Sequence, residues 1–303
     1  MIVLGSNQYG KAEVRLLRVD RTEPAHALHD LNVTVTLSGA FADTHLTGDN
    51  QAVLTTDAQK NTVFAFAAEH GVGQIEDFAL RLARHFATSR EAVTCARVGV
   101  EEYAWEPVGG TGHSFARAGR EIRTATVTHD GTRSWTVSGL RDLVLLNTTG
   151  SEFWGFARDR YTTLAETADR ILATAVNARW RHAQAPDDWA GSYGTARDLL
   201  IEAFAQTHSY SLQQTLYAMG KRVLEGLPTV AEIRLSLPNK HHFDVDVSPF
   251  GVDSEGEVFY AQDRPYGLIE GTVQRDGTVQ RDDTVQHDDT VQRDDMSAPV
   301  QVW

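Results

Sequence analysis

The stretch "LHDLNVTVTLSGAF", which runs from Leu28 to Phe41, decides how the fold begins. Its apolar residues recur at every second position: Leu31, Val33, Val35 and Leu37. This period of two is typical of a strand with one buried face. The same alternation appears earlier, at Val14 and Leu16 of "AEVRLLRVDR". The chain is therefore predicted to open with two half-buried strands.

A helix and two more strands are predicted to follow. The helix shows the i, i+3, i+4, i+7 spacing of a single apolar face, which is formed by Ile75, Phe78, Ala79, Leu82, Ala83 and Phe86. The stretches "AVTCARVGVEEYAWEP" (92–107) and "EIRTATVTHDGTRSWTVSGL" (121–140) return to strand composition. Within the second stretch, the pair Asp130-Gly131 predicts a hairpin turn.

A similar series of elements begins near Asp142 with "LVLLNTTGSEFWGF". Thr163 and Glu166 have the spacing of a capping box, which predicts a helix through Arg179. Further helices are predicted over 195–207 and 212–224, ahead of a strand in "EVFYAQDRPYGLIEG" (257–271). Because strands cluster at both ends of each series, we predict an α+β fold with antiparallel sheets rather than a βαβ nucleotide fold. Neither G-x-G-x-x-G after a strand nor G-x-x-x-x-G-K-[ST] occurs.

The stretch "LSLPNKHHFDVDV" (235–247) is interpreted as two strands that meet at a polar corner. Apolar residues alternate on both sides of Pro238, and four hydrogen-bonding side chains lie at the corner: Asn239, Lys240, His241 and His242. Adjacent histidines suggest a metal site. On an extended segment, however, they point to opposite faces and are poor co-ligands. A supporting His-x-His with Cys or Glu is not evident.

Composition limits the function classes. The chain has 303 residues, of which 41% are hydrophobic, enough for one large core or two domains. Its single cysteine, Cys95, excludes an intrachain disulfide, and no apolar run reaches the length of a membrane span. A net charge of −13 argues against nucleic acid as a general partner. A soluble intracellular protein without a membrane or nucleic-acid partner is expected.

The C-terminal region from Thr272 consists of four hexapeptide copies, "TVQRDG TVQRDD TVQHDD TVQRDD", which end at Asp295. A six-residue period can indicate a β-helix, but units with one apolar residue each cannot bury a core. We therefore expect a solvated and largely disordered tail without chemistry of its own.

Four segments hold candidate functional residues, although each has an ordinary structural explanation. Lys11 in "NQYGKAEVR" stands at a strand start, where a lysine is usually solvated. Thr56 and its neighbours in "LTTDAQKNT" are ordinary helix caps. Arg170 in "FWGFARDRYTTLAETADRIL" has the i, i+4 spacing to Glu166 of a helical ion pair. In "LQQTLY", an amphipathic helix would simply expose its two glutamines.

Together, and in this order, these segments resemble the urate oxidase (uricase) family. The matching segments are "YGK", "TTDAQKNT", "SEFWGFARDRYTTLAETADRILAT", "LQQTLY", "SLPNKHHFDVD" and "DRPYGLIE", and the resemblance extends roughly from Asn7 to Gly271. It implies two tandem tunnelling-fold (T-fold) domains, over 1–141 and 142–271, followed by the tail at 272–303. It also implies that two chains close a barrel, that two barrels stack into a homotetramer, and that active sites lie between subunits.

The resemblance further implies that urate is oxidised by O2 to 5-hydroxyisourate and H2O2 without a metal or organic cofactor. Phe153 would stack on the purine, and Arg170 and Gln213 would grip its polar edge. The remaining implied roles are a proton relay of Lys11, Thr56 and His241, a purine contact from Asp57, apolar walls from Leu164 and Leu212 with the Leu212 backbone as a further contact, and an oxygen or water site at Thr56 and Asn239.

Two other functions stay open at this point. Some T-fold relatives bind zinc and act on pterins, which the adjacent histidines would allow, although the ligand set is poor. A non-catalytic purine-binding protein would keep Arg170, Gln213 and Phe153 but lose Lys11 or Thr56, and both are present. The last three residues, Gln301-Val302-Trp303, are not a peroxisomal signal, so a bacterial cytoplasm is the expected location.

Overall fold

The computed structural model describes residues 1–252 and 256–276. In this part of the chain, eight strands form a sheet in the order β1 to β8, and the pairs β1–β2, β2–β3, β3–β4 and β7–β8 are antiparallel. The strands are β1 (Tyr9–Asp20), β2 (Ala27–Gly39), β3 (Val93–Pro107), β4 (Phe115–His129), β5 (Ser134–Asn147), β6 (Leu172–His182), β7 (Val230–Asp244) and β8 (Phe259–Gln274). The helices are α1 (Ala42–Leu46), α2 (Thr56–His70), α3 (Ile75–Thr88), α4 (Trp189–Gln206), α5 (Leu212–Gly226) and a short 3₁₀ turn, Ser248–Phe250. The predicted α+β class is confirmed, and no described helix is long and apolar enough to cross a membrane.

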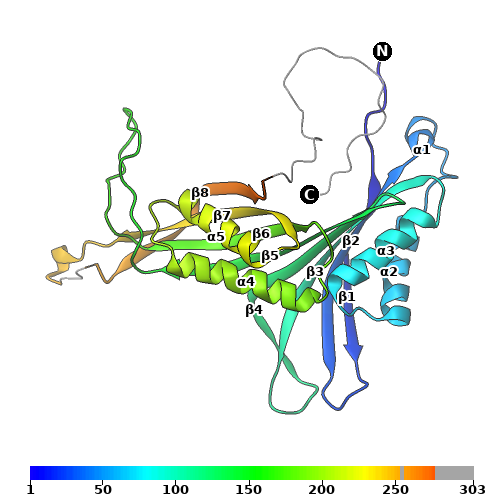
Figure 1. Cartoon of the computed structure of the whole chain (residues 1–303), viewed down its shortest axis with the longest axis horizontal. Helices are drawn as coiled ribbons and strands as arrows, with labels where there is room; N and C mark the ends of the chain where they lie inside the picture. Colours follow the sequence, from blue (N-terminus) through cyan, green and yellow to red (C-terminus); the bar gives the residue numbers. More distant parts are fainter. Residues whose placement is uncertain (253–255, 277–303) are drawn as a thin grey trace. The chain divides into compact units, whose positions relative to one another are not determined.

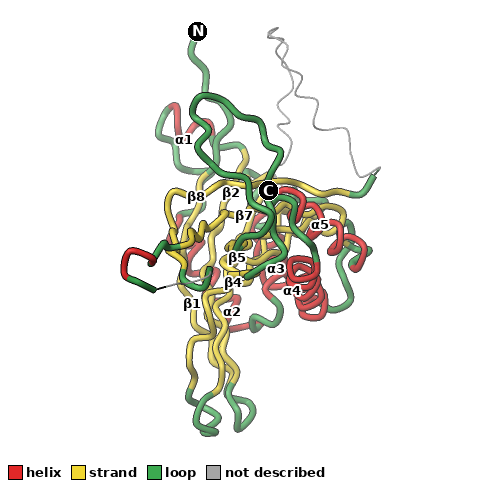
Figure 2. The backbone as a smooth tube through the Cα atoms, turned by 90° about the vertical axis from the view of Figure 1, so that its left-hand side faces the viewer, coloured by secondary structure: helices red, strands yellow, loops and turns green. Residues whose placement is uncertain are grey.

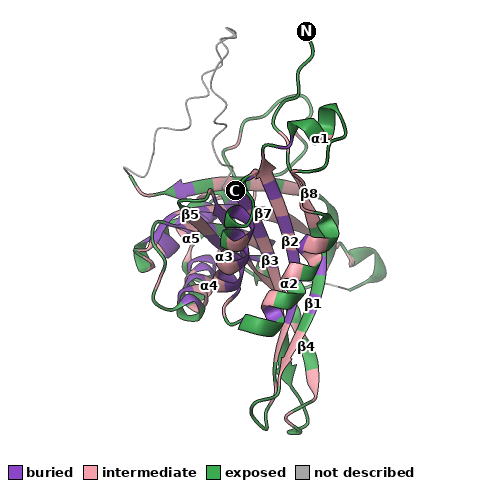
Figure 3. Cartoon of the chain, turned by 90° about the vertical axis from the view of Figure 1, so that its right-hand side faces the viewer, coloured by how far each residue is buried: buried purple, intermediate pink, exposed green. Residues whose placement is uncertain are grey.

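The first of two compact units comprises Met1–Gly139 and Arg181–Trp189. Helices α2 and α3 lie against one face of the strands β1 to β4 (Figure 1). The alternating residues of β2 are buried to 1% exposure or less, which confirms the predicted half-buried strand: Leu31, Val33, Val35 and Leu37. Figure 3 shows buried positions along β2 and β3, and these residues share one core cluster with residues of α2 and α3.

Helix α3 supplies most of the apolar surface that covers this sheet. All six residues of its predicted face are fully buried, so that prediction is confirmed: Ile75, Phe78, Ala79, Leu82, Ala83 and Phe86. Glu76 and Asp77 lie in the first turn, where negative charge interacts favourably with the helix dipole. Truncating one buried aromatic ring to alanine typically costs about 3–5 kcal/mol of stability.

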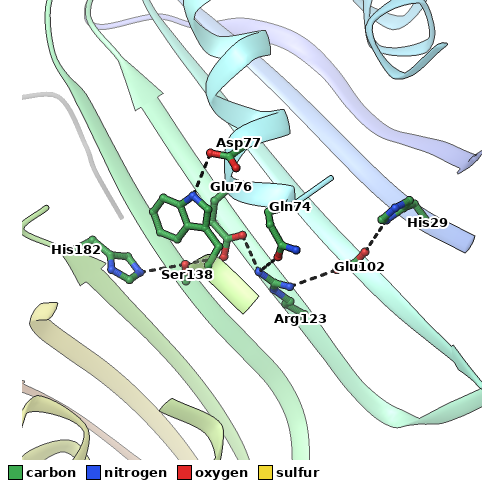
Figure 4. Close-up of polar contacts among 9 residues, drawn as sticks. His29, Gln74, Glu76, Asp77, Glu102, Arg123, Ser138 and His182 are labelled. Atoms are coloured by element: carbon green, nitrogen blue, oxygen red, sulfur yellow. Dashed lines mark hydrogen bonds and ion pairs between the residues drawn. The ribbon is translucent and has the colours of Figure 1, made fainter. Parts of the chain in front are cut away.

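A buried polar network links α3 to the strands beneath it (Figure 4). The fully buried Glu76 carboxylate accepts a hydrogen bond from Arg123 Nη2 at 2.8 Å and another from Ser138 Oγ at 2.8 Å. His182 Nε2 lies 3.1 Å from the same hydroxyl. Burial raises the pKa of Glu76 and lowers the pKa of His182 to about 4. The imidazole is therefore neutral at pH 7.

The segment Arg181–Trp189, which begins with the last two residues of β6, also belongs to this unit. The indole Nε1 of Trp189 donates a hydrogen bond to the Asp77 carboxylate at 3.0 Å, and its ring packs edge-on against His182. These contacts, together with the histidine in the network, attach the segment to α3.

Two hairpins of the first unit, β1–β2 and β3–β4, project beyond its helices (Figure 2). Their loops contact each other, because His26 N donates to Gly112 O at 2.8 Å. Gly112 has a φ of +72°, which favours glycine. Behind the loops, the guanidinium groups of Arg15 and Arg117 lie 4.4 and 4.3 Å from the ring centroid of Tyr103. Such cation–π contacts hold the hairpins together.

The second unit comprises Leu140–Trp180 and Ala190–Arg275. Helices α4 and α5 pack on its strands, as expected for the helices predicted at 195–207 and 212–224, although α4 begins earlier, at Trp189. Its core includes Leu172, Trp180, Leu200, Phe204, Leu212, Met219, Val223, Ile233, Leu235 and Leu237. Ser211 caps α5 by accepting a hydrogen bond from Gln214 N at 3.2 Å.

The predicted helix from Thr163 through Arg179 is wrong. Residues 164–171 form a connection, and 172–182 form β6. Glu166 does not close a capping box, because its carboxylate accepts a hydrogen bond from Gly155 N at 3.0 Å. The residues of β6 instead follow a period of two, since alternate positions are fully buried: Leu172, Thr174, Val176, Ala178 and Trp180. Because there is no helix here, the predicted helical ion pair of Glu166 and Arg170 is wrong as well.

The polar corner predicted within 235–247 is also wrong. β7 is a single strand that passes through Pro238 and ends at Asp244. The irregularity lies on its partner instead. Asn239 pairs with Gly267 and His241 with Gln262, so three extra residues of β8 are accommodated between these pairs. The polar side chains therefore lie opposite a bulge rather than at a turn.

The first hexapeptide copy is partly folded, which corrects the predicted start of the tail at residue 272. β8 continues to Gln274, and Val273 is 9% exposed within the second unit's core. Arg275 donates hydrogen bonds to backbone carbonyls near the end of α5, including Leu227 O at 3.2 Å. The later copies, from residue 277 onward, lie outside the described residues.

Candidate functional site

Lys11 lies near the start of β1 and is half-buried. The preceding Gly10 passes so close to β2 that an added Cβ would come within 1.9 Å of Val35 O. After Lys11 the register shifts: Lys11 pairs with Val35 and Val14 with Val33, which leaves one extra residue on β1. Bulges of this kind redirect side chains and are frequent beside functional sites. The bulge therefore fixes the local direction of the Lys11 backbone.

Thr56 and Asp57 form the exposed first turn of α2. Thr55 is the N-cap, and its hydroxyl accepts a hydrogen bond from Ala58 N at 3.1 Å, as expected of a cap. The chain just before this helix is fixed to β1, because Leu54 N donates to the Tyr9 hydroxyl at 3.0 Å. Tyr9 thus connects the strand that carries Lys11 to the start of the helix that carries Thr56.

Asp57 is an anion that follows Thr56 in the first turn of α2. Its carboxylate accepts hydrogen bonds from Lys60 Nζ at 2.5 Å and from Asn61 Nδ2 at 3.0 Å. The hydrogen bond and charge of Lys60 lower the pKa of Asp57, and the charge of Lys11 contributes to this shift. Lys11, Thr56 and Asp57 therefore form one group, in the first unit. Because the Asp57 side chain is occupied, its backbone N–H is the better candidate for a ligand contact.

Phe153 and Arg170 meet on the connection between β5 and β6. The Arg170 guanidinium carbon lies 5.1 Å from the centroid of the Phe153 ring. Two backbone hydrogen bonds between Phe153 and Thr167, of 2.9 and 3.1 Å, form an isolated antiparallel bridge beside them. The Nε of Arg170 is buried and has no hydrogen-bond partner among the residues that the structure describes. Burial lowers the pKa of this guanidinium.

Glu152 stabilises the chain on the other side of Phe153. Its carboxylate accepts a hydrogen bond from Trp154 Nε1 at 2.6 Å and lies 3.0 Å from His208 Nε2. These contacts, that of His208 first, lower the pKa of Glu152. The residue preceding Phe153 is therefore tied to the segment that leads into α5.

Leu212 and Gln213 begin helix α5, and Gln213 is exposed. The side chain of Leu212 is 1% exposed within the core, so its backbone, rather than its side chain, is available to a ligand. Ser209 connects this helix start to the Phe153 segment: Glu152 N donates to Ser209 O at 2.8 Å, and Ser209 N donates to Gly150 O at 2.9 Å. The helix start is thereby held beside the loop that carries the aromatic ring.

Asn239 and His241 lie on β7 opposite the bulge in β8, and both are half-buried. Burial, the nearby charge of Arg170 and then that of His242 lower the pKa of His241. His241 therefore lies close enough to Arg170 for the charge of the guanidinium to lower the pKa of the imidazole. Phe153, Arg170 and His241 form a second group, which belongs to the second unit.

Leu164 is 51% exposed on the connection between β5 and β6. The supporting residues Tyr9, Glu152 and Ser209 were not singled out from sequence. Tyr9 and Glu152 carried a signal, because they belong to the "YGK" and "SEFWGFARDRY" segments, whereas Ser209 carried none. Within the described ranges, no group of three or more His, Cys, Asp or Glu side chains could hold a metal ion.

Comparison with known proteins identifies the family. The family model described as Uricase matches residues 7–128 and 136–270. The chain is 52% identical to a uricase of Arthrobacter globiformis, with 91% of each chain covered, and 39% identical to a uricase of Dictyostelium discoideum, over 91% of this chain and 98% of the relative.

Solved structures agree with this assignment. The crystal structure of the Arthrobacter globiformis uricase matches with a TM-score of 0.88 at 52% identity, covering 91% of this chain and 96% of that one. The urate oxidase of Bacillus sp. TB-90 matches with a TM-score of 0.75 at 26% identity, covering 89% of this chain and all of that one. By family model, by sequence identity and by fold, the chain belongs to the uricase family.

Proposed function

We propose that this chain catalyses the oxidation of urate by O2 to 5-hydroxyisourate and H2O2, with no metal or organic cofactor. The observation that carries the proposal is the buried, unpartnered Nε of Arg170 beside the Phe153 ring. A half-buried guanidinium with free donor capacity next to an aromatic face suits a flat anion. Urate is such an anion, and membership of the uricase family supports the same substrate.

The second unit would provide the purine grip. The Arg170 fork and the Gln213 carboxamide match the alternating acceptors and donors on the rim of urate. Stacking on Phe153 would add about 1–3 kcal/mol, by analogy with nucleobase stacking. The Leu212 backbone N–H lies in the first turn of α5 and has no carbonyl partner within the helix, so it is suited to an anionic oxygen. Leu164 would contribute an apolar contact.

The first unit would provide the proton relay. Lys11 and Thr56 belong to one group, and His241 of the second unit would complete the relay above the purine. Because the pKa of His241 is lowered, its imidazole is neutral at pH 7 and can accept a proton. The backbone N–H of Asp57, in the first turn of α2, would contact the purine beside Thr56.

The reaction balances with water as the one further reactant. Urate gives up two electrons and two protons, and O2 accepts both pairs to become H2O2. Water supplies the hydroxyl group that forms the new bond at C5 of the purine. The side chains of Asn239 and Thr56 offer a carboxamide and a hydroxyl that would hold first O2 and then this water.

The proposal includes an assembly. Lys11 and Thr56 of one chain would meet Arg170 and His241 of a neighbouring chain, within a homotetramer whose active sites lie at subunit interfaces. Oligomers of this kind are usually symmetric, so every interface of the same type would carry the same site. A bacterial cytoplasm is the location that we propose, in line with the bacterial relative.

Two measurements on EDTA-treated protein test the reaction. We expect the ultraviolet absorbance of urate to fall with release of H2O2 in equal amount. The variants Lys11→Ala and Thr56→Ala should each lower kcat by about 10²–10⁴-fold, the range of lost acid–base catalysis. The kcat of the double variant should be little lower than that of the less active single variant, because the relay acts as a unit. Additive losses, or a near-normal kcat for Lys11→Ala, would reject the relay.

A complementation experiment tests the shared site. Lys11→Ala and Arg170→Ala chains are each expected to form inactive homo-oligomers. Co-expressed in equal amounts, they should recover about a quarter of wild-type activity, because one site in four then combines two intact halves. Activity that stays at background after mixed oligomers have been isolated would show that each site is built within one chain.

A further inference from the structure

The connection between β5 and β6, residues 148–171, carries both Phe153 and Arg170 and contains no helix or named strand. A segment of this kind cannot rely on a regular backbone ladder to set the positions of its side chains. Its geometry must come from specific hydrogen bonds, and buried or constrained backbone groups require partners. One carboxylate supplies several of these partners.

Asp169 is that carboxylate. Its Oδ1 accepts hydrogen bonds from Gly150 N at 2.9 Å, Arg170 N at 3.1 Å and Ser151 N at 3.4 Å. Its Oδ2 accepts one from Thr149 Oγ1 at 2.6 Å. A single side chain therefore joins the strand end that leads to Phe153 with the residue that carries the guanidinium.

These bonds leave the guanidinium free. Asp169 contacts Arg170 through the backbone N–H, while the guanidinium lies over the Phe153 ring. The hydrogen bond from Thr149, with further backbone hydrogen bonds, lowers the pKa of Asp169, which keeps the group ionised at neutral pH. The carboxylate thus orders the loop without neutralising the cation that an anionic substrate would need.

We propose that Asp169 is a positioning residue for substrate binding, which sets the placement of the Arg170 guanidinium relative to the Phe153 ring. The loop is closed on one side by the bridge of Phe153 with Thr167 and on the other by Asp169. Losing the second closure leaves the backbone bridge and the hydrogen bond from Gly155 N to the Glu166 carboxylate to join the two arms of the loop. The proposal rests on the purine grip proposed above.

A matched control lies within the same connection. Asp159 Oδ1 accepts hydrogen bonds from Tyr161 N at 3.0 Å and from Thr162 Oγ1 at 2.7 Å, so it also combines a threonine and a backbone donor. Its contacts stay within four residues and do not join the Phe153 and Arg170 segments. Asp159→Ala therefore removes a comparable set of local hydrogen bonds without affecting the proposed placement of Arg170 and Phe153.

The experiment compares Asp169→Ala with Asp159→Ala in steady-state assays with urate. We expect Asp169→Ala to raise KM at least about tenfold, because misplacement by an ångström can cost about 10²-fold, while kcat changes less than about threefold. The Kd of a non-oxidisable purine such as xanthine should rise in parallel. Asp159→Ala should keep wild-type KM and Kd. Equal KM values for the two variants would overturn the proposal, as would a loss confined to kcat.

A second pair of variants covers failure of Asp169→Ala to fold. Thr149→Val removes the 2.6 Å bond to Asp169, and Thr162→Val removes the corresponding bond to Asp159. We expect a rise in KM for Thr149→Val and none for Thr162→Val, and equal values would again contradict the positioning role.

If wild-type protein does not oxidise urate, or Arg170→Ala binds it normally, the proposed function itself fails. If both behave as proposed and Asp169→Ala is normal, only the positioning role fails.

Discussion

Replacing Arg170 by alanine is the sharpest test of the purine grip. The side chain ends beside the Phe153 ring, and its buried Nε has no hydrogen-bond partner among the described residues. Removing it therefore disrupts no hydrogen bond of that atom in the free protein. Apart from the contact with the Phe153 ring, the expected loss is therefore a loss of ligand binding.

The magnitude follows from the number of donors. A guanidinium fork can make two hydrogen bonds to an anionic rim, and hydrogen bonds to charged groups contribute about 1.5–3 kcal/mol each. Two such bonds correspond to about 3–6 kcal/mol, or a rise of about 10²–10⁴-fold in Kd. Arg170→Lys keeps a positive charge but loses the planar fork, so it should recover only part of this affinity.

The assay is titration of a non-oxidisable purine, together with KM for urate from the fall in absorbance. Thermal unfolding of each variant provides the control for folding. A Kd within about threefold of wild type for Arg170→Ala, less than 1 kcal/mol by the same conversion, would refute the assignment. Full recovery by Arg170→Lys would show that charge alone, and not the fork, binds the ligand.

Three further predictions concern the supporting structure. His182 stays neutral in the folded protein, so between pH 7 and pH 5 the unfolded chain binds more protons than the folded one. The free energy of unfolding should therefore fall by about 2 kcal/mol over this range. Denaturant titrations of a His182→Gln variant should not show this fall. Tyr9→Phe leaves Leu54 N without its partner and should lower kcat while purine Kd stays constant. Gly10→Ala places a methyl group 1.9 Å from a backbone oxygen and should lower both Tm and kcat, whereas Gly5→Ala, with open space around it, should change neither.

Sequence periodicity identified the elements whose burial is one-sided. The α3 face and the alternating residues of β2 were predicted correctly because each has a single covered surface. β6 was mistaken for a helix, since the spacing of Thr163 and Glu166 matches a capping box. The structure uses Glu166 to hold Gly155 instead, a contact across eleven residues that local spacing does not reveal. The alternation of Thr174 and Val176 was the better guide.

The residue types of the candidate site were predicted through family resemblance rather than through any local pattern. Arg170 and Phe153 are separated by sixteen intervening residues, and their approach depends on the bonds of Asp169 and the bridge at Thr167. An aspartate inside an irregular connection has no periodicity to mark it. Positioning residues of this kind become visible only when the hydrogen bonds are known.

The folded start of the hexapeptide array determines where the chain can be shortened. Cutting after Gly271 would remove Val273 from the second unit's core and Arg275 from the carbonyl groups of Leu227 and Val230. Both residues look dispensable in sequence, because the triplet Val-Gln-Arg that contains them recurs in later copies. A shortened protein for crystallisation or production should therefore retain Asp276, and a version that ends at residue 271 should be the less stable of the two.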